Sequence, residues 1–304
     1  MKRILLIANK NWEAAPILNA LLNPLIRSSS LGDPSIINYP WNYPQGSIAP
    51  RAVWSSFPGM QFELWCIQDI MEPKWNTSSS QGKVIDMPKI INFAPDPPSM
   101  VVALGTAASG SKTVNHNGCV VMGSNVFIHN YHPNGSNPDS VLDEPANFEK
   151  LITSSITEEF FEIVNAHLKN QVAQNLLKPF LHPAETIQLI AKKEYVALST
   201  INVTNYKEYP QSDPAGMAAF ENAGTKMPVG SVESTHGLIR LLIPGCPFIF
   251  VSGIANRFTL IGTDVNGTDN HENVKTNAVN YSAAFNIGVA MGCIIPEISK
   301  YLNL

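Results

Sequence analysis

The apolar run from Phe248 to Ile254 constrains the fold of this chain more than any other segment. Continuous runs of this kind, without a polar residue at every second position, are typical of strands that are buried on both faces of a parallel sheet. A Pro-Gly pair at residues 244–245 precedes the run, and leucines at helical spacing precede the pair. The pattern predicts a helix that opens near Ser231, a turn, and a buried strand that leads to Asn256.

Glu233 falls in the first turn of this predicted helix, and Asn256 follows the predicted strand. Because a helix and a strand joined by a short turn run antiparallel, the helix start and the strand end are expected at the same edge of the layer. Open α/β sheets bind ligands at the edge where their parallel strands end. We therefore expect Glu233 and Asn256 to face a common binding site.

The rest of the chain alternates between predicted strands and helices. Strands are expected at residues 4–8, 62–70, 100–104, 119–128 and 195–204, and helices after residue 13, at 155–177 and at 274–291, ahead of Pro296. Residues 38–59 and 205–214 are expected as loops. No repeat, low-complexity tract or linker interrupts the chain. We therefore predict one α/β domain over residues 1–304, with three layers and a central mixed, largely parallel sheet flanked by helices.

The charge of the chain excludes several classes of partner. A net charge of −4 provides no positive field for nucleic acid, and no cluster of Lys and Arg suggests a membrane surface. The apolar run at residues 4–8 is too short for a secretory signal, and no run approaches the roughly eighteen apolar residues of a membrane span. We therefore expect a cytoplasmic protein.

The cysteines and histidines predict neither a metal nor another cofactor. The four cysteines are scattered without metal-ligand spacing, so they are expected as buried reduced thiols. His116, His129 and His132 have no histidine partner at i, i+4 and no neighbouring acid. They are expected in surface loops.

Two short motifs resemble a known family. Val232-Glu233, ahead of the Pro-containing turn, and Gly253-Ile254-Ala255-Asn256, at the end of the apolar strand, resemble the C-terminal signature of the nucleoside phosphorylase and nucleosidase superfamily. That superfamily includes methylthioadenosine nucleosidases and purine nucleoside phosphorylases. The resemblance implies that Glu233, with Val232 beside it, binds the ribose hydroxyls of a nucleoside. It also implies that Asn256 faces the purine base.

Two further segments extend this resemblance. Gly105, Thr106 and Ala107 follow a predicted strand and resemble the family's glycine turn beside the sugar, with Thr106 at the hydroxyl position. Asn202 and Val203 lie at the end of another predicted strand, where members of the family contact the purine. The resemblance implies that all five residues bind the substrate.

Glu13 begins the first predicted helix and has two interpretations. An acidic residue in the first turn complements the helix dipole whatever the protein does. In the nucleosidases of the resembled family, an acid near this position activates the attacking water, and Glu13 is the residue here that best matches it. The residues alone leave both interpretations open.

The resemblance implies cleavage of the N-glycosidic bond of a purine nucleoside, with Glu13 and Asn256 as the catalytic residues. The transition state resembles the oxocarbenium ion of sugar hydrolysis, so Glu13 is expected to deprotonate the attacking water. Phosphorylases of the family bind phosphate with arginines at two glycine turns, and this chain lacks those arginines, which favours hydrolysis. Lys10, Lys112 or Arg257 could still bind phosphate, so phosphorolysis remains the alternative.

Asn256 leaves the substrate open. Family members that act on adenine nucleosides commonly carry Asp there, whereas an amide has no titratable proton to donate. An Asn suits a 6-oxopurine, or it marks a nucleoside-binding protein without catalytic activity. A covalent mechanism through Cys119 or Cys246 is the least favoured alternative, because neither lies in a nucleophile turn. By resemblance we also expect a homo-oligomer.

Overall fold

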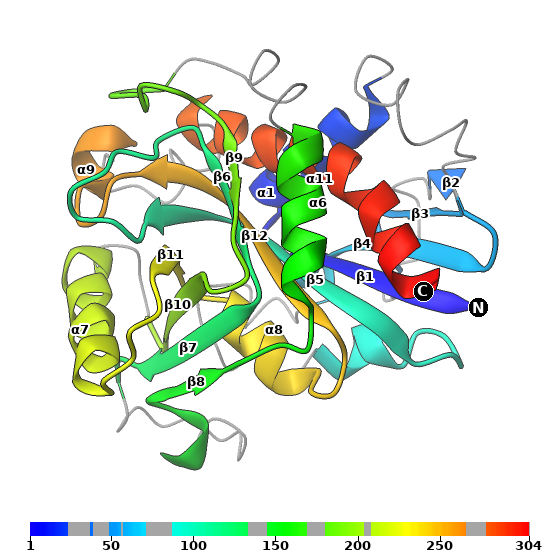
Figure 1. The fold of residues 1–304 in the computed structure, drawn as a ribbon, viewed down its shortest axis with the longest axis horizontal. Helices are drawn as coiled ribbons and strands as arrows, with labels where there is room; N and C mark the ends of the chain where they lie inside the picture. Colours follow the sequence, from blue (N-terminus) through cyan, green and yellow to red (C-terminus); the bar gives the residue numbers. More distant parts are fainter. Residues whose placement is uncertain are drawn as a thin grey trace.

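The computed structural model describes residues 1–23, 37–38, 49–55, 57–70, 87–132, 145–168, 180–203, 208–265 and 278–303. These residues form one mixed sheet of twelve strands with helices on both faces (Figure 1). The predicted α/β class, with a central mixed sheet flanked by helices, is confirmed. The strands are β1 (Lys2–Ala8), β2 (Ile37–Asn38), β3 (Ala52–Trp54), β4 (Met60–Cys66), β5 (Pro98–Ser109), β6 (Val120–Gly123), β7 (Asn125–Asn130), β8 (Lys150–Ile152), β9 (Leu189–Ala191), β10 (Val196–Ile201), β11 (Val229–Glu233) and β12 (Phe248–Asn256). The helices are α1 (Asn11–Leu22), α3 (Ile67–Ile70), α6 (Glu158–Leu168), α7 (Tyr209–Asn222), α8 (His236–Leu242), α9 (Ile261–Asp264) and α11 (Ala278–Asn303), with a short 3-10 helix at Pro145–Asn147.

The strand order is β2-β3-β4-β1-β5-β11-β10-β7-β8, and β12 joins β5 to β6, which in turn pairs with β9. Pairing is parallel between β1 and both β4 and β5, between β5 and β12, between β10 and both β7 and β11, and between β6 and β9. It is antiparallel where β11 meets β5 and where β12 meets β6. It is also antiparallel among the edge strands β2, β3 and β4 and between β7 and β8. The sheet is therefore less uniformly parallel than expected, and antiparallel pairs join its parallel groups.

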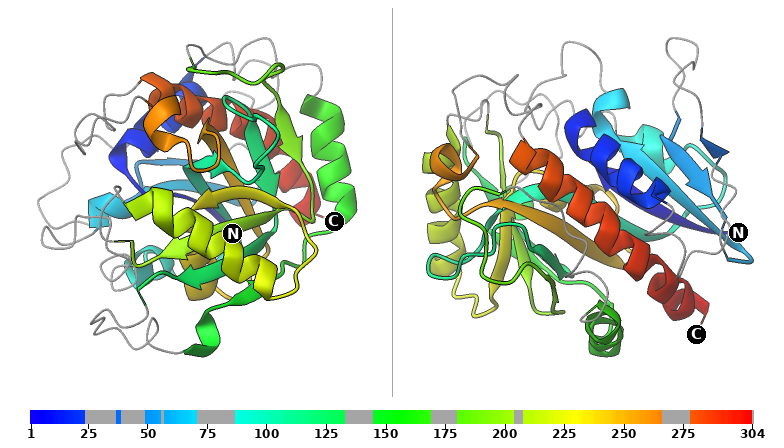
Figure 2. Two further views of the ribbon diagram at one scale, coloured as in Figure 1. Left: turned by 90° about the vertical axis from the view of Figure 1, so that its left-hand side faces the viewer. Right: turned by 90° about the horizontal axis from the view of Figure 1, so that it is seen from above.

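Helices cover both faces of the sheet (Figure 2). The described residues form four apolar clusters, and the two largest lie on opposite faces of the sheet. On one face α1, α6 and α11 pack together, and their apolar side chains join those of β1, β4, β5, β6 and β12. On the other face α8 contacts β5, β7 and β10, and its Ile239 packs in the second core with Phe250. α7 covers β7 and β10, where Phe220 packs edge to face on Phe127 with ring centroids 5.2 Å apart.

α11 is the longest of the described helices and lies in the larger core. By length and composition it could cross a membrane, but 83% of its most apolar window is buried inside the fold. Glycines allow its close packing: a Cβ on Gly253 of β12 would lie 2.3 Å from the carbonyl oxygen of Ala283, and a Cβ on Gly288 would lie 2.5 Å from that of Ile17 in α1. The apolar character of α11 is therefore that of a core helix.

Two predicted elements near the site are corrected by the structure. Residues 105–109, expected as a turn, continue β5, because β12 pairs along one edge of this stretch and β11 along the other. Residues from Ser231 to Glu233, expected as the start of a helix, belong to β11, which lies between β5 and β10. α8 therefore begins after Glu233, at His236. Pairing on both edges overrides the weak local preferences of small residues.

Helix boundaries shift as well. The loop expected at 205–214 ends earlier than predicted, since Tyr209–Asn222 is helical and Pro210 lies in the first turn, where its missing N–H has no intrahelical partner to lose. α11 continues through Pro296 instead of stopping before it. The apolar residues on both sides of that proline, Ile295 and Ile298, are fully buried. Their burial offsets the lost backbone hydrogen bond.

The remaining differences concern short strands and a helix start. The loop expected at 38–59 contains β3, whose Trp54 stacks on Phe62 of β4 with ring centroids 5.7 Å apart. The strand expected at 62–70 ends at Cys66, and the one expected at 119–128 is interrupted at Ser124. The helix expected from residue 155 begins at Glu158, and beyond Leu168 the predicted segment lies outside the described residues.

Candidate active site

A pocket lies where β1, β5, β11 and β12 meet the starts of α1, α7 and α8. The strand register explains why: Ala108 of β5 pairs with Val232 of β11 on one side and with Asn256 of β12 on the other. Ala8, the last residue of β1, pairs with Leu104 of β5, which places the turn into α1 beside them. The described residues that line the pocket are Asn9, Trp12, Glu13, Leu104, Gly105, Thr106, Ala107, Ala108, Tyr209, Asp213, Val232, Glu233, Ser234, Thr235, His236, Ala255, Asn256, Ile261, Val265 and Asn280.

The pocket includes seven of the residues predicted from the sequence: Glu13, Gly105, Thr106, Ala107, Val232, Glu233 and Asn256. Asn202 and Val203 are not among its described lining residues. β11 separates β10 from β5, so the end of β10 is one strand further from the pocket than expected. Asn202 instead donates a hydrogen bond from Nδ2 to Oδ1 of Asn130 (2.7 Å), and its left-handed backbone, with φ of 59°, turns the chain after β10. Val203 is buried.

Glu13 is held by donors from two elements. Its Oε1 accepts hydrogen bonds from the backbone N–H (2.8 Å) and the hydroxyl (3.0 Å) of Thr106. Its Oε2 accepts one from the backbone N–H of Lys10 (3.0 Å), in the capping-box position of α1. Glu13 therefore caps its helix, as one interpretation expected, and the same contacts aim its carboxylate at β5 and the pocket.

Glu233 is the last residue of β11, and its carboxylate binds the start of α8. It accepts hydrogen bonds from the backbone N–H groups of Thr235 and His236 (2.8 Å for His236) and from the hydroxyl of Ser199. The hydroxyl of Ser199 accepts a hydrogen bond from the N–H of Gly237 in turn (2.6 Å). The first N–H groups of a helix carry partial positive charge, so α8 stabilises the buried carboxylate.

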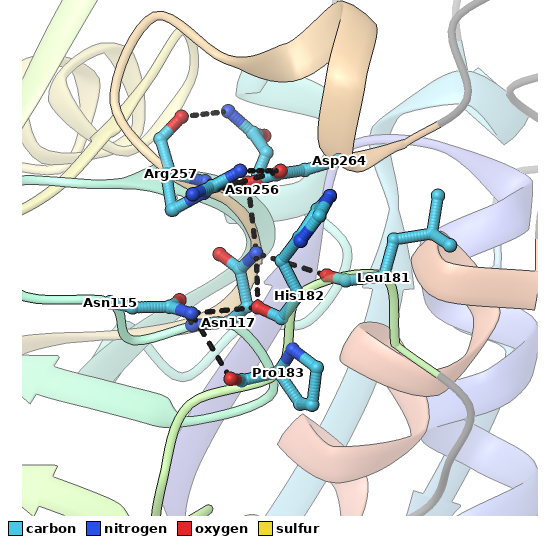
Figure 3. Close-up of polar contacts among 8 residues, drawn as sticks. All are labelled: Asn115, Asn117, Leu181, His182, Pro183, Asn256, Arg257 and Asp264. Atoms are coloured by element: carbon cyan, nitrogen blue, oxygen red, sulfur yellow. Dashed lines mark hydrogen bonds and ion pairs between the residues drawn. The ribbon is translucent and has the colours of Figure 1, made fainter.

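Asn256 ends β12, and an ion pair braces the backbone just after it (Figure 3). The Nδ2 of Asn256 donates to the carbonyl oxygen of Arg257 (2.9 Å). The guanidinium of Arg257 donates from Nη2 to Oδ1 of the buried Asp264 (2.7 Å), and Asn117 donates from Nδ2 to Oδ2 (2.9 Å). Burial opposes ionisation of Asp264, but these hydrogen bonds outweigh it and hold the pKa of Asp264 below its ordinary value.

The segments that brace Asn117 are themselves cross-linked. Nδ2 of Asn115 and Nδ2 of Asn117 both donate to the carbonyl oxygen of His182, at 2.7 and 3.1 Å (Figure 3). The loop around His182 therefore positions Asn117, whose amide donates a hydrogen bond to the Asp264 carboxylate. The backbone just after Asn256 is thus tied through Asp264 and Asn117 to the segment of His182.

The cations considered for phosphate have other neighbours. Arg257 is paired with Asp264, as described above. Lys112 lies 3.7 Å from Glu221 and over the ring of Phe258, 5.6 Å from its centroid. Lys10 is buried beside α1. Lys10, Lys112 and Arg257 are not among the described residues that line the pocket.

The first turns of α7 add two residues that the sequence did not indicate. Asp213 is 7% exposed, and burial, together with the charge of Glu233, raises the pKa of Asp213 to about 7. Burial likewise raises the pKa of Tyr209 to about 12, although its hydroxyl lies 3.5 Å from that of Ser234. Both were missed because this stretch reads as a polar loop, and no local pattern shows that it folds over the pocket.

His236 was missed for a different reason. It is the first residue of α8 and is 1% exposed, with its ring stacked on that of Phe250 at a centroid distance of 5.8 Å. Its place three residues after Glu233 was visible in the sequence, but the predicted helix start at Ser231 put it inside a helix. Asn9 and Trp12 were also overlooked, and their closeness to Glu13 was the available signal.

Other predicted features of the side chains can be located. All four cysteines are unpaired; Cys66, Cys119 and Cys293 are buried, and Cys246 is partly buried. Cys119 and Cys246 are not among the described residues that line the pocket. His129, expected in a surface loop, lies in β7 and contacts Glu149 at 2.8 Å. Among the described residues, no group of three or more His, Cys, Asp or Glu is placed to hold a metal ion.

Comparison with known proteins finds a likeness in structure and none in sequence. No family model matches the sequence, and no curated protein does. The structure aligns with a variant of the 5′-methylthioadenosine/S-adenosylhomocysteine nucleosidase of Helicobacter pylori, crystallised with 5′-methylthioadenosine in the active site. This alignment covers 98% of this chain and 99% of that one, with a TM-score of 0.54 and 13% identity.

Two other solved structures align over nearly their whole length. The S-adenosylhomocysteine nucleosidase of Streptococcus pyogenes, in complex with 5-methylthiotubericidin, covers 97% of this chain and 96% of its own, with a TM-score of 0.53 and 12% identity. The futalosine hydrolase of Helicobacter pylori covers 98% and 100%, with a TM-score of 0.52 and 14% identity. The chain has the fold of these nucleosidases, as the resemblance of its motifs implied.

Proposed function

We propose that the protein hydrolyses the N-glycosidic bond of a purine nucleoside and releases the free base and ribose or a 5′-substituted ribose. The observation that carries this proposal is the convergence of the buried residues Glu13, Glu233 and Asn256, from three separate segments, on one pocket. Proteins of the same fold add support, since the Helicobacter pylori nucleosidase holds 5′-methylthioadenosine in its active site and a futalosine hydrolase is among them.

Glu13 acts on the attacking water in this proposal. Cleavage builds positive charge on the ribose ring and negative charge on the base. The water oxygen forms a bond to C1′, while the electron pair of the C1′–N9 bond leaves with the base. Glu13 accepts the proton released by the water, and its hydrogen bonds from Thr106 and Lys10 keep the carboxylate in position for that transfer.

Glu233 binds the ribose. Its carboxylate retains acceptor capacity beyond the hydrogen bonds from α8 and Ser199, because a carboxylate has about four lone-pair sites. About one site remains after these three hydrogen bonds, and a ribose hydroxyl donates to it. The negative charges of Glu13 and Glu233 also stabilise the positive charge that develops on the sugar.

Asn256 and Asp213 serve the leaving base. The amide of Asn256 hydrogen-bonds the base, which fits a 6-oxopurine, but it has no titratable proton. Asp213 lines the same pocket, and because its pKa is about 7, a large fraction of it is protonated at neutral pH. It is therefore the group in this pocket that is suited to deliver a proton to the departing base.

Hydrolysis is favoured over phosphorolysis by the charge of the pocket. Three carboxyl groups, those of Glu13, Asp213 and Glu233, line it. The negative charge of the carboxylates among them repels a phosphate dianion and leaves a neutral water unaffected. A nucleoside-binding protein without catalytic activity is the second candidate, and the amide of Asn256 in place of an acid is the observation that favours it.

Release of free base from a panel of purine nucleosides tests the proposal. We expect turnover without added phosphate, measured by chromatography of the base. Glu13→Gln should lower kcat at least about 100-fold, because it removes the acceptor of the water proton, while nucleoside binding by calorimetry is retained. Strict dependence on phosphate would show phosphorolysis. Tight binding without turnover across the panel would show a binding protein.

A further inference from the structure

His236 is a buried polar side chain of the pocket that the proposed chemistry leaves unused. It lines the pocket, and neither ring nitrogen has a hydrogen-bond partner of good geometry among the described residues, although the carbonyl of Leu104 lies near the ring. Leaving a buried polar group without a partner costs about 1–3 kcal/mol. A histidine in this position is therefore expected to bind something that enters the pocket.

Gly105 shows which part of the pocket the ring faces. A Cβ added to Gly105 would lie 3.2 Å from Nε2 of His236 and 3.4 Å from Oε1 of Glu13. The two atoms therefore border the same small volume beside β5, and the missing side chain of Gly105 keeps that volume open. The stacking of the imidazole on Phe250 holds it there, with an interplanar angle of 26°.

We infer that His236 and Glu13 together hold the attacking water, which donates one hydrogen bond to the carboxylate of Glu13 and the other to Nε2 of His236. The inference rests on the proposed hydrolysis and adds to it a second group that orients the nucleophile. As the bond from oxygen to C1′ forms, the first proton passes to Glu13. His236 keeps its own proton throughout.

The protonation of the ring agrees with this role. Burial lowers the pKa of His236, against the charge of Glu233 and the nearby carbonyl of Leu104, so the imidazole is neutral at pH 7. A neutral imidazole has one N–H and one acceptor nitrogen. Nδ1 lies 3.9 Å from Oε1 of Glu233, whose charge favours the tautomer protonated on Nδ1. We assign Nε2 as the acceptor on this ground.

Two hydrogen bonds orient a water far better than one. With both hydrogens donated, the lone pairs of the oxygen point away from Glu13 and His236, and a sugar bound above Gly105 receives them at C1′. Precise placement of a nucleophile accounts for a large part of enzymatic rate enhancement, and a misplacement of about 1 Å can cost about 100-fold.

A crystal structure of the wild-type protein at high resolution tests the geometry. We expect an ordered water within hydrogen-bond distance of both Nε2 of His236 and a carboxylate oxygen of Glu13. In His236→Phe, which keeps the stacking on Phe250 but has no nitrogen, that water should be absent and its surroundings unchanged. A wild-type structure without this water, or with Nε2 bound to a protein group, would overturn the inference.

Steady-state kinetics on the nucleoside that the wild type cleaves best tests the role. For His236→Phe we expect kcat to fall about 10- to 100-fold, with KM changed by less than about threefold, because the ring acts on the water and leaves the nucleoside untouched. His236→Gln is the matched control, since its amide places a donor and an acceptor near the Nε2 position. It should recover most of the lost kcat.

The outcomes separate this inference from the proposed function. If the wild type cleaves a nucleoside and His236→Phe cleaves it as fast, the proposed hydrolysis is supported and the role of His236 is contradicted. A raised KM with unchanged kcat would also overturn the role, because it would show that the ring contacts the nucleoside. If the wild type cleaves no nucleoside of the panel, the proposed hydrolysis is wrong, and so is the role of His236 in orienting the water.

Discussion

Glu13 and Glu233 are buried carboxylates whose oxygens accept backbone N–H donors at helix starts, so the contacts that cap a helix also orient a functional group. Asp213 shares their pocket but has no such set of helix N–H donors to favour its charge. Burial and the charge of Glu233 therefore raise its pKa to about 7. Asp213 is thus suited to donate a proton near neutral pH, as acid catalysis requires.

The raised pKa of Asp213 can be tested by comparing the free energy of unfolding of Asp213→Asn with that of the wild type. The pKa of Asp213 is 3.8 in a model compound and about 7 in the folded protein, so the folded state holds more protons than the unfolded state between those values. Its contribution to the free energy of unfolding therefore decreases as pH rises from about 4 to about 7. We expect Asp213→Asn to be more stable than wild type at pH 8 by on the order of 3 kcal/mol, and equal to it near pH 4.

Urea denaturation of both proteins at pH 4 and pH 8 measures this effect. Glu221→Gln provides the control, because Glu221 lies on the same helix but its side chain is 63% exposed. The control should show no growing difference from wild type as pH rises. Equal stability of Asp213→Asn and wild type at pH 8 would mean that Asp213 ionises normally.

At the scale of the elements, the packing of α1 against α11 sets the position of Glu13. α1 carries Glu13 near its start and packs along α11, which in turn lies against β12. The close approach depends on Gly288, whose added Cβ would lie 2.5 Å from the carbonyl oxygen of Ile17 and 2.6 Å from the Cβ of Ala20. Backbone atoms cannot yield as a flexible side chain does, so the helices would have to separate.

Gly288→Ala is expected to destabilise the protein by about 1–3 kcal/mol, because overpacking a tight contact outweighs the gain of up to about 1 kcal/mol in helix propensity. It should also lower activity, since α1 moves with Glu13. Gly262→Ala in α9 is the matched control: no atom of the described residues lies within 4 Å of the added Cβ. Urea midpoints compare the two. A Gly288→Ala protein as stable as Gly262→Ala would contradict the packing argument.

At the scale of the whole molecule, the pocket belongs to no single segment. Glu13, Thr106, Glu233 and Asn256 are brought together by the order β1-β5-β11 and by the pairing of β12 with β5. A ligand that bridges these residues contacts strands that are distant in sequence. It therefore binds the folded state alone, and its binding energy adds to the stability of the entire sheet.

Thermal unfolding of the Glu13→Gln variant with and without a purine nucleoside tests this coupling, because the variant should bind without consuming the ligand. At a ligand concentration of about 100 times Kd we expect about 2.7 kcal/mol of added stability, and a rise in Tm of several degrees. A pyrimidine nucleoside serves as the control and should give a smaller shift. Equal shifts with both would contradict recognition of the purine base.

The sequence by itself determined the class of the fold and seven of the twenty described residues that line the pocket. The apolar runs of β1, β5, β10 and β12 have no polar alternation and are therefore recognisable as buried strands. The motifs around Glu13, Gly105, Glu233 and Asn256 each occupy a few neighbouring residues, so they too are visible without a structure. All four of these segments contribute to the observed pocket.

Only the tertiary structure decided how the pocket is assembled. Residues 105–109 and 231–233 have weak local preferences, and they become strand because each is paired along two edges. The same pairing places β11 between β5 and β10, and Asn202 and Val203, which follow β10, are not among the described residues that line the pocket. Asp213 and His236 gain their properties from burial among distant residues. Burial and pairing across long sequence separations leave no local pattern, which is why the sequence could not show them.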